Sequence, residues 1–206
     1  MKNLTLRGRI IPSFLVILAI MALMVVVDYQ RLLQVEAEAK SINTDAVPGI
    51  YYSTSIGALW FPGLVAVQDA FNSESEQERQ PGLGALPKND QHLKDDIEQY
   101  RRTVVRGEDQ RMFADFEKAL QTYMRIRAEI LEPAMLADPA RAQAKIKSDL
   151  RPAFYAGRDV LATMVAANKE QADESAIGIQ KGVDKAEVGM LVSLGLAIVA
   201  AIICGV

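Results

Sequence analysis

Two uncharged apolar stretches lie near the ends of the chain and enclose a long amphipathic segment. The first covers residues 10–27 and the second covers residues 188–206. Each approaches the ~20 apolar residues that an α-helix needs to cross a bilayer. The pattern predicts two transmembrane helices around a domain at residues 28–187, with a short N-terminus at residues 1–9.

The charges beside the first stretch predict its orientation. Lys2, Arg7 and Arg9 precede it and Asp28 follows it, so the positive-inside rule places residues 1–9 in the cytoplasm. A cleaved signal peptide is the competing interpretation. It is disfavoured because the apolar run has 18 residues and ends in Val25-Val26-Val27, without the small residues of a cleavage site.

The middle segment predicts four helices. The first runs from Asp28 to about Asn72, and Pro48 and Pro62 are expected to bend it without ending it, since the apolar pattern continues past both. The other three carry stripes that step by three and four residues, as in packed helix bundles. These stripes are Leu93, Ile97, Tyr100 and Val104; Met112, Phe116, Ala119, Tyr123, Ile126 and Ile130; and Leu150, Phe154, Gly157, Leu161, Met164, Asn168, Ala172, Ser175 and Ile179.

Turn residues separate these helices. Residues 73–89 are rich in Ser, Gly and Pro and predict a loop, after which Asp90 caps the second helix. Gly107 ends that helix, Pro133 ends the third, and the fourth begins near Ala140 and meets the second span without a strong breaker. The sequence therefore predicts an all-α fold: an antiparallel up-down-up-down four-helix bundle flanked by two transmembrane helices.

Composition narrows the possible functions. Residues 28–187 hold all 26 acidic and 20 of the 23 basic residues, a formal charge of −6, which gives no basic face for nucleic acid. The single cysteine, Cys204, lies in the second span and excludes an intrachain disulfide. With His92 as the only histidine, no His/Cys metal site or Cys–His couple can form. We expect no catalytic residue, no metal and no cofactor, and so not an enzyme.

Three segments carry a family resemblance. They are Leu4-Thr-Leu-Arg-Gly-Arg9 before the first span, Ala46-Val-Pro-Gly-Ile50 in the first helix, and residues 107–123 at the turn into the third helix. With the overall layout, they resemble the sensor region of bacterial methyl-accepting chemotaxis proteins of the four-helix-bundle type, over essentially the whole chain.

The resemblance implies a receptor in the bacterial inner membrane with its bundle in the periplasm. It implies a homodimer or other homo-oligomer that binds a small molecule and signals through the fourth helix and second span. Cytoplasmic signalling partners would be reached only through an output region absent from this chain. One departure matters: no Arg or Lys lies between Lys40 and Arg79, so the arginines with which aspartate receptors bind their ligand are not found here.

Helix register predicts a different site. In an antiparallel bundle, residues equally far from the distal turn lie at similar height, and one such layer gathers arginines and aromatic residues. Arginine's planar fork matches a carboxylate, and tyrosine hydroxyls can add hydrogen bonds. We expect a di- or tricarboxylate or an aromatic acid as ligand. The candidate residues are Trp60, Arg101, Arg102, Tyr123, Arg125, Arg127, Arg151, Tyr155 and Arg158.

The residue pattern leaves alternatives open. The arginines could belong to solvated faces, paired with Glu98, Glu129, Glu132 and Asp149, while Tyr100 and Tyr123 lie on core stripes. The string Trp60-Phe61-Pro62-Gly63 indicates a kinked, core-packed segment, or else an unwound segment beside a pocket or at a subunit interface. Alternative functions are the sensor of a histidine kinase or cyclic-dinucleotide enzyme, and a membrane-anchored bundle that binds only proteins.

Overall fold

The structure is a computed structural model of the whole chain and describes residues 6–73 and 75–205. The chain divides into two compact units: unit 1 comprises Met1–Ile42 and Asp173–Val206, and unit 2 comprises Asn43–Ala172. Every regular element in the described residues is a helix. The predicted all-α fold is confirmed.

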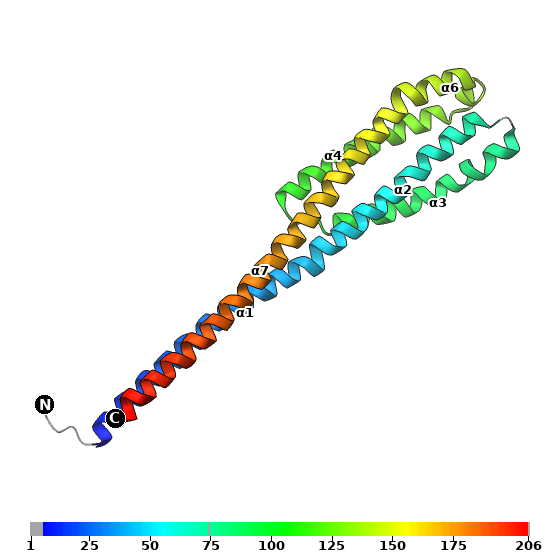
Figure 1. Cartoon of the computed structure of the whole chain (residues 1–206). Coiled ribbons are helices and arrows are strands. Elements are labelled where there is room, and N and C mark those ends of the chain that lie inside the picture. Colours follow the sequence, from blue (N-terminus) through cyan, green and yellow to red (C-terminus); the bar gives the residue numbers. More distant parts are fainter. Residues whose placement is uncertain (1–5, 74, 206) are drawn as a thin grey trace. The chain divides into compact units, whose positions relative to one another are not determined.

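Unit 2 contains the helices of a four-helix bundle. Helix α2 (Val47–Asn72) lies beside α3 (Glu76–Arg101), which returns antiparallel to it (Figure 1). Helix α4 (Gly107–Ile130) follows, and the short helices α5 (Pro133–Leu136) and α6 (Pro139–Lys145) lead into α7 (Arg151–Gly205). The predicted start of the fourth helix near Ala140 matches the start of α6, whereas the second helix ends at Arg101 and not at Gly107, which instead begins α4.

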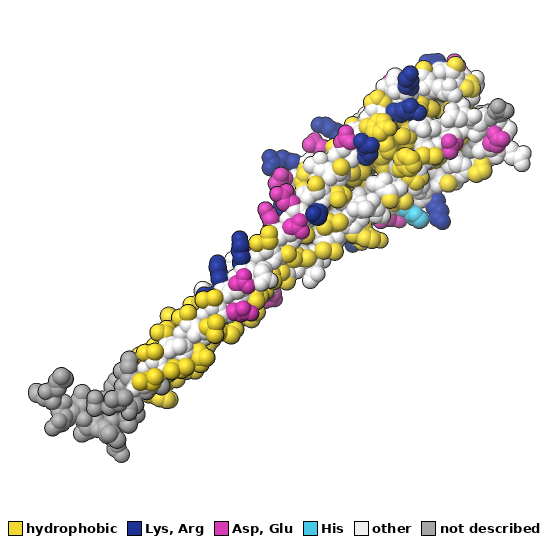
Figure 2. Space-filling model, in the orientation of Figure 1, with side chains coloured by type: hydrophobic (Ala, Val, Ile, Leu, Met, Phe, Trp, Pro, Cys, Tyr) yellow, Lys and Arg dark blue, Asp and Glu magenta, His cyan; other side chains and the backbone are white. Residues whose placement is uncertain are grey.

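Unit 1 pairs α1 (Leu6–Ser41) with the part of α7 that begins at Asp173 (Figure 1). By length and composition, one helix in the described part, Phe14–Asn72, contains a window apolar enough to cross a membrane, with a mean hydropathy of 2.0. Large apolar side chains are exposed along residues 14–27 of α1 and 188–202 of α7, and they cover much of the face of this unit drawn in Figure 2.

Glycines of α7 allow the two helices of unit 1 to approach closely. A Cβ at Gly182 would lie 2.6 Å from Cγ2 of Val35, and one at Gly178 would lie 3.1 Å from Cδ of Glu38. A residue without a Cβ lets the side chain of the neighbouring helix approach the backbone closely. The prediction that no strong breaker separates the fourth helix from the second apolar stretch is confirmed, because α7 continues through both glycines.

The predicted loop at residues 73–89 is wrong, because α3 begins at Glu76. Ser75 caps this helix by accepting a hydrogen bond from the backbone N–H of Glu78 at 3.3 Å. Pro81 and Pro87 lie inside the helix with exposed side chains, while Leu86 is buried. Burial of apolar residues on α2 therefore overrides the helix-breaking tendency of these prolines.

Two π-helical turns accommodate two other prolines. One spans Ile42–Ala46 and the other Ile146–Leu150, so each ends two residues before a proline, Pro48 or Pro152. In the second turn, the N–H of Arg151 donates to the carbonyl of Ile146, the i→i+5 bond of a π-helix. The wider turn accommodates the proline ring, which would clash with the carbonyl four residues earlier. The helix therefore continues past Pro48, and past Pro62 in α2, as predicted.

The core of unit 2 centres on Trp60. Its ring centroid lies 4.7 Å from that of Tyr123, 5.7 Å from Phe116 and 6.3 Å from Phe154. Its indole N–H donates to the carbonyl of Phe154 in α7 at 3.2 Å. A Cβ at Gly157 would lie only 2.5 Å from Cζ2 of Trp60, so α7 can pack here only with glycine at position 157.

We predict that Gly157→Ala destabilises unit 2 by about 1–3 kcal/mol, because the new methyl group overpacks the core against Trp60. The matched control is Gly84→Ala in α3, where a Cβ meets no atom within 4 Å, and where alanine's helix propensity should add up to ~1 kcal/mol. Trp60 is the chain's single tryptophan, so its fluorescence during urea denaturation reports on this core. Equal stability of the two variants would contradict the packing argument.

Candidate ligand-binding groove

A groove of about 720 Å³ lies between α2 and α7 in unit 2. Its lining residues recur at helical spacing on both sides. They are Ser53, Thr54, Gly57, Trp60, Phe61, Leu64 and Gln68 from α2, and Arg151, Phe154, Tyr155, Arg158, Leu161, Ala162 and Val165 from α7. Trp60, Phe154 and Leu161 are buried and form an apolar floor, while Phe61 and Tyr155 are 59% and 46% exposed.

Two arginines give this groove its cationic character. Arg151, Tyr155 and Arg158 lie four and three residues apart, so they share one face of α7. Arg158 stacks over the Tyr155 ring at 4.8 Å and contacts Asp159 at 3.1 Å, in a pair that is well exposed to solvent. Among the described residues, Arg151 has no ion pair. Its fork of donors is therefore free to bind an anion.

The structure brings four of the nine predicted residues together. Trp60, Arg151, Tyr155 and Arg158 line the groove, and Tyr123 packs behind Trp60 in the core. The other four arginines lie elsewhere. Arg101 pairs with Glu98 and Glu117, Arg102 is exposed just after α3, Arg125 pairs with Glu129, and Arg127 pairs with Asp90.

Helix geometry explains this separation. Because α3 begins at Glu76 and not at Asp90, Arg101 and Arg102 lie at the end of α3 far from the distal turn. Arg125 and Arg127 are two residues apart and therefore face in different directions on α4. The solvated-face interpretation holds for Arg101 and Arg125.

Phe61 lines the groove but was not among the predicted site residues, although it belongs to the string Trp60-Phe61-Pro62-Gly63 that the sequence analysis singled out. The string Trp60-Phe61-Pro62-Gly63 lies within an unbroken α2. Trp60 turns into the core and Phe61 onto the groove, so the segment is core-packed and borders a pocket without unwinding.

A partly buried ion pair lies behind the groove. Arg127 is 7% exposed and its guanidinium donates to Asp90 of α3. A Cβ at Gly63 of α2 would lie 3.1 Å from this guanidinium and 3.2 Å from the Tyr123 hydroxyl. Burial raises the pKa of Tyr123 to about 12, although the charge of Arg127 acts in the opposite direction. The Tyr123 phenol therefore stays neutral throughout the physiological range.

A second cluster of buried polar side chains lies near the first and last residues of unit 2. The Asn168 amide donates to the Tyr100 hydroxyl at 3.1 Å, and the Gln171 amide donates to Asp45 at 2.6 Å. Gly49 leaves room for Asn168, since a Cβ there would lie 2.3 Å from its Oδ1. Burial raises the pKa of Tyr100, and the hydrogen bond from Asn168 opposes this shift. Asn168 is therefore buried, as its place on the predicted stripe implies, and its amide is hydrogen-bonded there.

The comparison with protein families identifies the class of this chain. The family model for the four-helix-bundle sensory module for signal transduction, the module of methyl-accepting chemotaxis proteins, matches residues 3–181. The chain belongs to this family, whose module is a receptor domain and not a catalytic one. Neither the curated proteins nor the solved structures contain a match.

The raised pKa of Tyr123 predicts instability at high pH. The unfolded chain loses this phenolic proton near pH 10 and the folded chain holds it to about pH 12, so the stabilisation is complete below pH 10. The free energy of unfolding therefore falls as the pH rises from about 10 through about 12, by on the order of 2–3 kcal/mol in total. Tyr123→Phe should show a smaller loss across this interval, measured by urea denaturation at each pH. An unchanged loss in this variant would refute the assignment.

Proposed function

We propose that this chain is the sensor region of a transmembrane chemoreceptor and that it binds a small organic acid in the α2/α7 groove. The observation that carries the proposal is Arg151, which has no ion pair among the described residues and lines the same aromatic-floored groove as Arg158, about two helical turns further along α7. Arginine binds a carboxylate through two parallel hydrogen bonds. An acid with an apolar or aromatic body matches both the rim and the floor of the groove.

The proposal includes two membrane spans, at residues 10–27 and 188–206. It is supported by the exposed apolar side chains of both helices of unit 1 and by the window in Phe14–Asn72. Three basic residues before the first span and none within it favour a cytoplasmic N-terminus and a periplasmic bundle.

Signal transfer would run along α7. This helix supplies Arg151, Tyr155 and Arg158 to the groove and extends to Gly205. A ligand that contacts both α2 and α7 favours the bundle packing in which both sets of contacts form. The shift in equilibrium equals the difference in its affinity for the two packings.

Calorimetry on the full chain in detergent micelles tests the ligand proposal, with malate, citrate, aspartate and benzoate as probes. Arg151→Ala and Arg158→Ala should each weaken binding of the acid roughly 10- to 100-fold, since a hydrogen bond to a charged group contributes about 1.5–3 kcal/mol. Arg125→Ala is the matched control, because Arg125 is exposed, pairs with Glu129 and lies outside the groove. Binding of none of the acids, or an equal loss in the control, would contradict the proposal.

We also propose that two copies associate through α2. One face of this helix carries an exposed stripe with steps of four and three residues: Val47, Tyr51, Thr54, Ala58, Phe61 and Val65, of which only Val65 is partly covered. This is the spacing of a coiled-coil seam, and a two-fold axis would match it with itself. Because Thr54 and Phe61 also line the groove, ligand binding and association should influence each other.

Cysteine cross-linking tests this dimer. In a Cys204→Ser background, Ala58→Cys should form a disulfide-linked dimer on mild oxidation in the membrane, because symmetric seam positions bring identical residues within disulfide reach. Ala114→Cys, exposed on α4, is the control and should remain monomeric on a non-reducing gel. Equal cross-linking at both positions would indicate random collision.

A further inference from the structure

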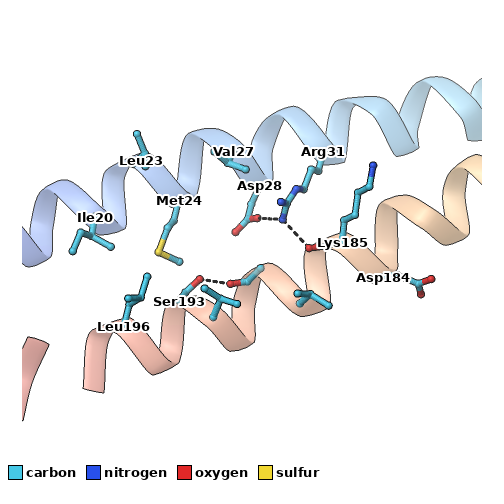
Figure 3. Close-up of a pocket in the computed structure, with 13 residues that line it drawn as sticks. Ile20, Leu23, Met24, Val27, Asp28, Arg31, Asp184, Lys185, Ser193 and Leu196 are labelled. Atoms are coloured by element: carbon cyan, nitrogen blue, oxygen red, sulfur yellow. Dashed lines mark hydrogen bonds and ion pairs between the residues drawn. The ribbon is translucent and has the colours of Figure 1, made fainter. Parts of the chain in front are cut away.

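A second groove, in unit 1, lies between α1 and α7 and has a volume of about 640 Å³ (Figure 3). Most of its lining is apolar, with Met24 and Val27 from α1 and Val192 and Leu196 from α7. Those side chains belong to the two apolar stretches, so in a membrane the groove faces hydrocarbon.

Charged groups mark one end of this groove. Arg31 donates to the backbone carbonyl of Lys185 at 2.8 Å and contacts Asp28 at 3.4 Å (Figure 3). Its guanidinium fits against α7 because residue 189 is glycine: a Cβ there would lie 2.4 Å from Nη1 of Arg31. Both apolar stretches end within one turn of this contact, so the charged rim lies at the level of the lipid headgroups.

Lys185 is the available cation at this rim. It is exposed, and no ion pair involves its ammonium group among residues 6–73 and 75–205. The rim also carries the carboxylates of Asp28 and Asp184. Asp184 accepts a hydrogen bond from Gln180 at 2.8 Å through one oxygen. Two cations and two anions thus surround the mouth of an apolar groove.

A neighbouring groove in unit 1 provides an internal comparison. It has a volume of about 280 Å³, and its lining includes Ile17, Met21, Leu194 and Ala197 without any charged residue. Lipid chains or another helix can cover such a surface without a headgroup contact. The pairing of an apolar channel with a charged rim is particular to the larger groove.

We propose that the larger groove binds one phospholipid, whose acyl chain lies along Met24, Val192 and Leu196 and whose phosphate contacts Lys185 and Arg31. This inference rests on the two membrane spans of the proposed function. The phosphate would pair with the Lys185 ammonium, at the level where Lys and Arg side chains near the ends of membrane helices reach the interface.

Charge complementarity selects the type of headgroup. Because the rim carries no net charge, a purely anionic headgroup gains attraction from Lys185 and Arg31 but meets repulsion from Asp28 and Asp184. Phosphatidylethanolamine carries a phosphate for the cations and a primary ammonium that donates hydrogen bonds to the carboxylates. The trimethylammonium of phosphatidylcholine cannot donate such bonds.

Native mass spectrometry of the full chain, delipidated in detergent, tests this site with phosphatidylethanolamine, phosphatidylcholine and phosphatidylglycerol of matched acyl chains. One phosphatidylethanolamine should bind per chain, about tenfold more tightly than either other lipid. Lys185→Gln should weaken this binding about tenfold, whereas the control Lys169→Gln, which removes a charge from the same helix in unit 2, should leave it unchanged. Equal affinity of the two variants, or tighter binding of phosphatidylglycerol, overturns the proposal.

A second pair of variants tests the channel itself. Val192→Trp should fill the larger groove and abolish lipid binding, while Leu194→Trp should fill only the smaller groove and leave it intact. If Val192→Trp abolishes Ala58→Cys cross-linking and leaves lipid binding intact, a second copy covers the groove and the lipid proposal is wrong. Retention of the chain in membranes after alkaline extraction tests the spans separately, so loss of lipid binding is distinguished from failure to insert.

Discussion

The contact between the Trp60 indole and Gly157 determines how the helices of unit 2 pack against one another. The ring fills the space between α2, α4 and α7, and its N–H donates to the carbonyl of Phe154. Because any side chain at residue 157 would meet the ring, this contact fixes how closely α2 and α7 approach. The same contact forms the floor of the groove and brings Tyr155 to its rim.

Glycines have the same role at the other helix contact. In unit 1, Gly182 receives Val35 and Gly189 receives the guanidinium of Arg31. Each glycine inside a helix lowers the stability of that helix by about 1 kcal/mol relative to alanine. In α7 this cost accompanies close packing at Gly157 in unit 2 and at Gly182 and Gly189 in unit 1. One helix thereby carries the arginines of the proposed acid site and the lysine of the proposed lipid site.

Which face of each helix is buried was easier to predict than the position of each residue along the bundle axis. Tyr100, Tyr123 and Asn168, which lie on the predicted stripes, are buried as expected, because apolar periodicity reports directly on which face meets the core. The position of a residue along this axis depends on where its helix begins. Because α3 begins at Glu76 and not at Asp90, Arg101 lies at the far end of the bundle. The candidate layer therefore divided, and only its part on α2 and α7 forms a groove.

Periodicity and composition over many residues were enough to predict the all-α class, the four helices and the two apolar stretches, and three short segments together with this layout indicated the family. Only the tertiary structure decided which arginines share a site and which are paired. Arg151 and Arg127 are equally basic in the sequence, but Asp90 neutralises one, while the other has no ion pair among the described residues. Pairing depends on side chains far apart in the chain, and local pattern carries no information about it.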